Sequence, residues 1–114
     1  KGAVVSYAVS VKEQVLGVDV GEGVVGESTA CQMAEGVARL LQSDCSVSTT
    51  GIAGPGGAEP GKPVGTVCIA VHIPDETIAR TFCFQGDREN VILQAADASL
   101  KLLEELIAKK KAKK

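Results

Sequence analysis

Aromatic residues are scarce in this 114-residue chain. It has no tryptophan, and Tyr7, Phe82 and Phe84 are its aromatic residues, although 45% of the chain is hydrophobic. The core is therefore expected to consist mainly of Val, Ile, Leu and Ala, a composition typical of α/β domains. A chain of this length is expected to form one domain and to bury a core without support from disulfides or metals.

Residues that commonly bind metals are also few. The only histidine is His72, and the four cysteines are widely spaced with no C-x-x-C pair: Cys31, Cys45, Cys68 and Cys83. This spacing argues against a zinc site, and no metal or other cofactor is expected. Each cysteine lies in an apolar pattern, which favours buried free thiols in a reducing compartment such as the cytoplasm.

The sequence lacks an apolar run of about eighteen residues and a signal-peptide pattern, so no membrane partner and no secretion are expected. Of the 12 basic residues, five lie within positions 109–114, which leaves 14 acidic and 7 basic residues before them, a net charge of -7. Because phosphate contacts need a basic surface, nucleic acid is not expected as a partner. We expect residues 109–114 to form a disordered, lysine-rich tail.

Hydrophobic periodicity predicts alternating strands and helices. The predicted elements are a strand over 2–9, a short helical turn over 10–17, a helix from an N-cap at Ser28 to about Gln42, strands over 44–50, 64–73 and 77–85, and a helix beginning at the capping residue Asp87. The turn "PDET" predicts an antiparallel hairpin between the last two strands. This order predicts an α/β fold, a mixed β-sheet with helices packed on its faces in three α/β/α layers.

A glycine-rich stretch, "TTGIAGPGG", follows the strand that ends near Thr50. It places the hydroxyls of Thr49 and Thr50 and several unhindered backbone amides at the carboxyl end of a strand, where open α/β sheets bind ligands. Such amides can bind an anion or an oxyanion. The spacing fits neither G-x-x-x-x-G-K-[ST] nor G-x-G-x-x-G. The alternative is a mobile connection between two strands, which is the commoner role of such a segment.

Two basic residues are further candidates. Lys12 follows Tyr7 by five residues just beyond the first predicted strand, and a partly desolvated lysine can act as a general base. Arg88 lies in the first turn of the last helix, where a guanidinium and free amides suit a phosphate or carboxylate. The alternatives are a solvated lysine and an exposed arginine beside a capping aspartate.

Four segments taken in order resemble the C-terminal domain of the CinA family, the nicotinamide-nucleotide amidases. They are "GAVVSYAVSVKEQVLGV", "GVVGESTACQMAEGVARLL", "TTGIAGPGGAEPGKPVGTVCIAV" and "FCFQGDRENV". The combination of "GIAGPGG" with "KPVGTV" is the most specific part. The resemblance covers nearly all of residues 2–108, which are expected to form a single domain.

The resemblance implies metal-free hydrolysis of the carboxamide of nicotinamide mononucleotide to nicotinate mononucleotide and ammonia, with a small-molecule nucleotide substrate and a homo-oligomer. A serine on an N-terminal helix of the family attacks the amide and a lysine activates it. Lys12 matches that lysine, and Tyr7 matches the tyrosine before it. The positions matching the family's substrate site are Thr50, Gly51, Ala53, Gly54 and Arg88.

The chain also departs from the family. The nucleophile motif, "ESCTGG" or similar, has no counterpart, because the sequence is already strand-like at its second residue; we expect a fragment that lacks the N-terminal helix and is inactive alone. Ser28 matches a helix start and is not expected to be the nucleophile. Ala8 and Val9 replace a polar pair, and Ile92 stands where the family is often basic. The alternative is a non-catalytic nucleotide-binding or structural relative.

Overall fold

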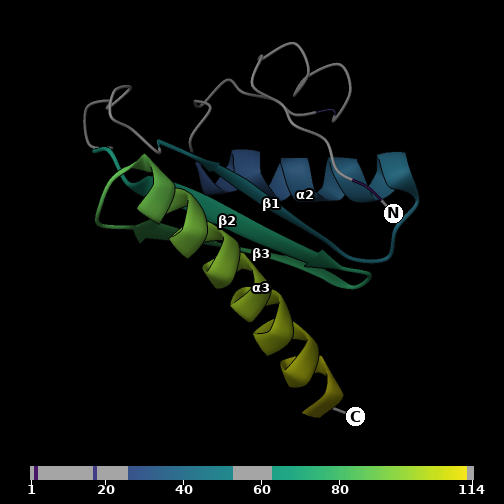
Figure 1. Ribbon diagram of the computed structural model, residues 1–114. Helices are drawn as coiled ribbons and strands as arrows, with labels where there is room; N and C mark the ends of the chain where they lie inside the picture. Colours follow the sequence, from purple (N-terminus) through teal and green to yellow (C-terminus); the bar gives the residue numbers. More distant parts are fainter. Residues whose placement is uncertain (1, 3–16, 18–25, 53–62, 113–114) are drawn as a thin grey trace.

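A computed structural model describes residues 2, 17, 26–52 and 63–112. Its elements are α2 (Glu27–Leu41), β1 (Ser46–Gly51), β2 (Thr66–Ile73), β3 (Glu76–Cys83) and α3 (Arg88–Ala112). The strands lie in the order β1-β2-β3, and both neighbouring pairs are antiparallel (Figure 1). The predicted hairpin between the last two strands is confirmed, because Ile73 pairs with Glu76 across its turn.

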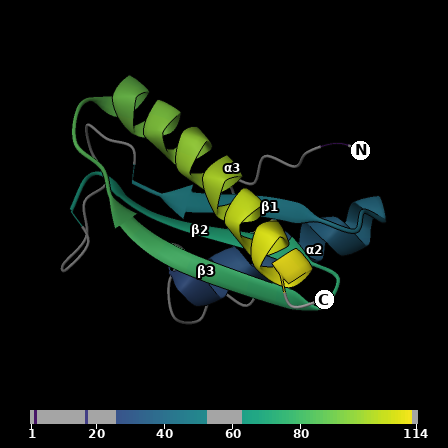
Figure 2. The same ribbon diagram turned by 90° about the horizontal axis from the view of Figure 1, so that it is seen from below.

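The two helices cover opposite faces of the sheet, with α2 on one side and α3 on the other (Figures 1 and 2). This arrangement confirms the predicted α/β fold with three layers. Almost all of the strand predicted over 2–9 and of the turn predicted over 10–17 lies outside the described residues. The mixed character of the predicted sheet depends on that strand, and the described strands pair only in antiparallel fashion.

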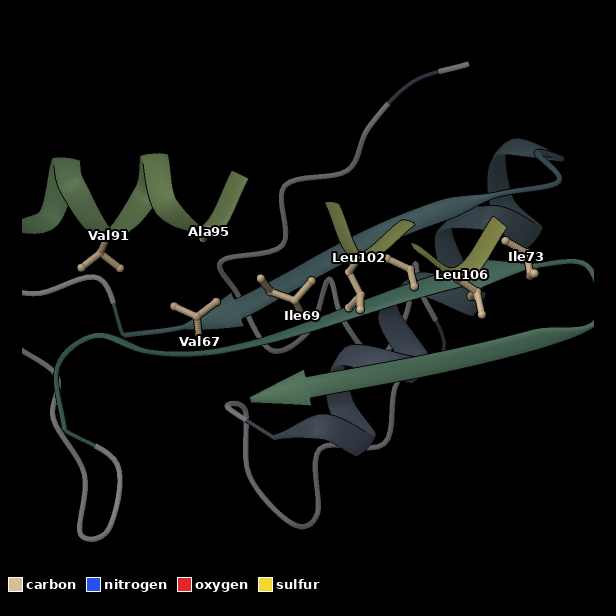
Figure 3. Packing of buried hydrophobic residues seen from close by; sticks show 8 residues of the cluster. Val67, Ile69, Ile73, Val91, Ala95, Leu102 and Leu106 are labelled. Atoms are coloured by element: carbon tan, nitrogen blue, oxygen red, sulfur yellow. The ribbon is translucent and has the colours of Figure 1, made fainter. Parts of the chain in front are cut away.

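The central strand β2 is apolar on both faces because a helix covers each of them. Its odd-numbered residues, from Val67 to Ile73, pack with Val91, Ala95, Leu102 and Leu106 of α3 (Figure 3). Its even-numbered residues Cys68 and Ala70 pack with α2. The aliphatic core predicted from the composition is thus divided between two interfaces, with larger side chains beneath α3 and small ones beneath α2.

The helix ends agree with the sequence at α3 and differ at α2. The Asp87 carboxylate accepts a 2.9 Å hydrogen bond from the Asn90 amide, which confirms the predicted cap. The prediction of Ser28 as an N-cap is wrong, because the N-cap of α2 is Gly26, which has no side chain to make a capping bond. Ser28 lies in the first turn, and its hydroxyl accepts a bond from Gln32.

Two further predictions differ from the structure. Helix α3 continues to Ala112, so Lys109 and Lys110 are helical. The predicted disorder of the tail is therefore wrong for residues 109–112. The prediction of four buried thiols is also wrong. Cys68 is buried and Cys31 is half-buried, whereas Cys45 and Cys83 are exposed; all four are free thiols. Within the described ranges, neither helix has the length and apolar character needed to cross a membrane.

Candidate functional site

A cavity of about 460 Å³ lies between the end of β1 and the N-terminal half of α3. The end of β1 and the start of α3 lie on the same side of the molecule (Figures 1 and 2). The lining residues come from β1, β2 and α3: Thr49, Gly51, Val67, Val91, Ile92, Ala95, Ala96 and Ser99. The walls are mostly apolar, and their polar groups come from Thr49, Ser99 and the backbone.

Strand alternation decides which of the two adjacent threonines faces this cavity. Thr49 pairs with Ile69, whose side chain lies beneath α3, and Thr49 lines the cavity. Thr50 pairs with Cys68, whose side chain lies on the α2 side, and Thr50 is buried. The hydroxyls of the "TT" pair therefore lie on opposite faces of the sheet, and Thr49 is the one at the cavity.

The backbone amides at the end of β1 alternate between β2 and the outer edge of the strand. The Ile52 amide donates to the Thr66 carbonyl at 2.9 Å, and the Ile52 carbonyl accepts from Gly65 at 2.7 Å. Since bonding to one neighbour alternates along an antiparallel strand, the Gly51 amide points away from β2, toward the outer edge of β1. Among the described amides at this strand end, Gly51 is thus the candidate donor to an oxyanion, and Ile52 is not.

A steric reason also requires glycine at position 51. A Cβ atom there would lie 2.6 Å from the Thr66 carbonyl oxygen and 2.9 Å from the Val67 Cα. These are backbone atoms of the paired strand, so neither can move aside as the end of a flexible side chain would. Gly51 therefore lets β1 approach the start of β2 closely, and its backbone lines the cavity.

Arg88 is exposed and is the first residue of α3, one helical turn before Val91 and Ile92. The residue lies at the end of the molecule that holds the cavity, although it is not among the lining residues. Asp87 and Glu89 flank it, so residues 87–89 carry a net charge of -1. The helix N-terminus and the guanidinium favour an anion, while the two carboxylates reduce that attraction.

Four of the predicted site residues, Tyr7, Lys12, Ala53 and Gly54, lie outside the described residues. The structure brings Gly51 and the first turns of α3 to one end of the molecule, with Thr50 turned toward α2. The sequence did not indicate the α3 wall formed by Ile92, Ala95, Ala96 and Ser99. Apolar residues at helical spacing predict core packing, and nothing in that spacing marks a cavity.

The cysteines offer no alternative nucleophile at this site. The half-buried Cys31 lies on α2, in the layer opposite to α3. Burial raises the pKa of its thiol, and the carboxylates of Glu35 and Glu27 raise that pKa further. Because the thiolate is the reactive form, Cys31 is a weak nucleophile at neutral pH. The described part of the chain also contains no group of three His, Cys, Asp or Glu side chains able to hold a metal.

Comparison with known proteins gives consistent similarities. Residues 1–107 match the CinA C-terminal domain. A CinA-like protein of Anaeromyxobacter dehalogenans is 47% identical over 104 residues, which are 88% of this chain and 26% of that protein. Another, from Thermosynechococcus vestitus, is 50% identical over 93 residues, 77% of this chain and 22% of its own length. The chain thus spans about a quarter of the length of these relatives.

Solved structures show the same similarity in three dimensions. A competence-damaged protein (CinA) superfamily protein from Klebsiella pneumoniae has a TM-score of 0.84 at 30% identity, over 90% of this chain and 67% of that chain. One from Enterobacter cloacae has a TM-score of 0.80 at 36% identity, over 90% of this chain and 62% of that chain. The names of these relatives state no reaction.

Proposed function

Because the chain belongs to the CinA C-terminal domain family, we propose that it forms the substrate site of an amidase acting on nicotinamide mononucleotide. The products of this reaction are nicotinate mononucleotide and ammonia. The observation that supports the proposal is the cavity at the carboxyl end of β1, bordered by Gly51 and by the N-terminal half of α3. Its volume, about 460 Å³, is within the range usual for small-ligand pockets.

In the proposed reaction, a serine contributed by residues outside this sequence attacks the carboxamide carbon. Neutral Lys12 accepts the proton of the serine hydroxyl as the oxygen–carbon bond forms. Charge then develops on the amide oxygen, and the Gly51 amide stabilises it. The carbon–nitrogen bond breaks, ammonia leaves with the proton from Lys12, and water hydrolyses the acyl-serine. Tyr7, Ala53 and Gly54 complete the site in this proposal, whereas Thr50, which faces α2, supports the strand end from the other side of the sheet.

The cavity walls suit the two halves of such a substrate. Val67, Val91 and Ala95 offer an apolar surface to the pyridine ring. Arg88 and the first turn of α3 face the phosphate in the proposed complex, where a guanidinium and helix amides favour an anion. No metal or cofactor takes part in these steps.

The decisive measurement is the release of ammonia and nicotinate mononucleotide from nicotinamide mononucleotide by a longer protein that contains this chain. Replacing the general base, Lys12→Ala, is expected to lower kcat by about 10²–10⁴-fold. The matched control is Lys101→Ala, which removes an exposed lysine that pairs with Asp97 on the surface of α3 and should leave kcat unchanged. No product from the folded protein, or equal loss in both variants, would contradict the proposal. The 114-residue chain alone is expected to show no turnover.

A second candidate function is nucleotide binding without catalysis. Two observations favour it: the apolar Ile92 lines the cavity at a position where the family resemblance implies a basic residue, and residues 87–89 are net acidic. Calorimetric titration with nicotinamide and nicotinate mononucleotides distinguishes the two functions. Binding of both nucleotides by a longer protein that forms no product would establish the non-catalytic one.

A further inference from the structure

The walls of the cavity contain no charged side chain among the residues that the structure describes. Their large side chains are the aliphatic ones of Val67, Val91 and Ile92, and their polar side chains are the hydroxyls of Thr49 and Ser99. Such walls suit a flat apolar ring and an uncharged polar group. A phosphate placed against them would lose its water without gaining a cation.

The start of α3, where helix amides favour an anion, already holds an anion that the chain itself supplies. The Asp87 carboxylate accepts the hydrogen bond of the Asn90 amide at 2.9 Å, and the Val91 amide donates to the Asp87 carbonyl at 2.9 Å. A phosphate at this helix end would lie beside the Asp87 carboxylate and would have to displace it to reach the Asn90 amide.

The other charges near the cavity give a phosphate little net attraction. Arg88 and Glu89 lie four and three positions before Ile92, so both are about one helical turn from the cavity wall. Their charges oppose each other, and Asp87 leaves residues 87–89 at a net charge of -1. The chain before residue 109 carries -7, which attracts the pyridinium cation of a nicotinamide nucleoside and repels an added phosphate.

We infer that the site selects the pyridine carboxamide and its ribose and gains little from the phosphate, so that nicotinamide riboside is a substrate comparable to nicotinamide mononucleotide. Ile92 determines this weak preference, because it lines the cavity about one turn from Arg88 and its apolar side chain is 49% exposed. The inference rests on the proposed function, since it takes the same carboxamide as ligand and the same bond as the one that breaks.

Calorimetric titration of a longer protein containing this chain with the riboside and with the mononucleotide, together with ammonia release from each, tests the inference. We expect the two dissociation constants, and the two kcat/KM values, to differ by less than about tenfold. A preference for the mononucleotide above about tenfold would overturn the inference and leave the proposed amidase intact. Similar binding of both ligands without product would support the inference and contradict only the proposed reaction. Binding of neither ligand would overturn both.

A gain of phosphate preference tests the role of Ile92. Ile92→Lys places a cation at the cavity wall and should raise the affinity for the mononucleotide relative to the riboside about three- to tenfold. The matched control is Leu93→Lys, which adds the same charge at the next position, 62% exposed and outside the cavity lining; its affinity ratio should stay within about twofold of wild type. Circular dichroism verifies that both variants fold. An unchanged ratio in Ile92→Lys, or the same rise in Leu93→Lys, would overturn the assignment of Ile92.

Discussion

Gly51 illustrates how one residue serves both the fold and the cavity. The absence of a side chain permits close approach to the Thr66 carbonyl and to Val67, and the backbone of Gly51 lines the cavity. Its amide points to the outer edge of β1 because the next amide, that of Ile52, is bonded to Thr66. The steric requirement is sufficient to explain glycine here. The proposed oxyanion contact uses the Gly51 amide, whose position is set by the same close packing of β1 against β2.

Replacing this glycine should destabilise the fold. Gly51→Ala forces a Cβ atom against the Thr66 carbonyl oxygen and the Val67 Cα, and we expect it to lower the free energy of unfolding by about 1–3 kcal/mol. Urea unfolding of the purified chain measures the loss. In the control Gly26→Ala, the new Cβ meets no atom within 4 Å, and the N-cap backbone is extended, so the cost should stay below about 1 kcal/mol. Equal losses would show that close approach is not the reason for Gly51.

At the scale of the element, α3 connects the cavity to the rest of the molecule. Its first half lines the cavity, and its inner face supplies a large part of the aliphatic core. The position of its first turn depends on the cap at Asp87, which holds the Asn90 amide at 2.9 Å. The cap also adds negative charge beside Arg88, so the same residue starts the helix and weakens the local attraction for anions.

Removing this cap should cost stability and loosen the start of α3. Asp87→Ala leaves the Asn90 amide without its side-chain acceptor and should lower the free energy of unfolding by about 1 kcal/mol. Asp87→Asn keeps an oxygen that can accept the bond and should retain most of the stability. Chemical denaturation followed by circular dichroism measures both variants. An alanine variant as stable as wild type would show that the cap contributes nothing in the folded protein.

At the scale of the whole molecule, the cavity results from the layered arrangement. Neither β1 nor α3 contains a hollow by itself. The space arises where the end of β1, with only Thr49 and Gly51 on the α3 side, faces small residues of α3 such as Ala95 and Ala96. The opposite interface, beneath α2, is filled by Ala30, Ala34 and Ala70.

Filling this space should affect ligand binding and leave folding intact. Thr49 is exposed and lies on a strand, where an aromatic residue is well tolerated. Thr49→Phe is therefore expected to change the free energy of unfolding by less than about 0.5 kcal/mol. If the cavity binds nicotinamide mononucleotide, the same variant should lower the affinity at least about tenfold, because the ring would occupy the ligand's space. Calorimetric titration measures this, with Thr49→Ser as the control. Unchanged affinity in the phenylalanine variant would place the nucleotide elsewhere.

The sequence by itself determined the strands and helices that the structure describes, the three layers, the cap at Asp87 and the family. These features depend on local periodicity, on one side chain bonding to a nearby amide, and on segments that match along the chain. Tertiary structure alone decided that Thr49 faces the cavity while Thr50 faces α2, that Ala95 and Ala96 line a hollow, and that Cys45 and Cys83 are exposed. The physical reason is that periodicity fixes which residues share a face, whereas the element packed against that face decides whether they meet core, cavity or water.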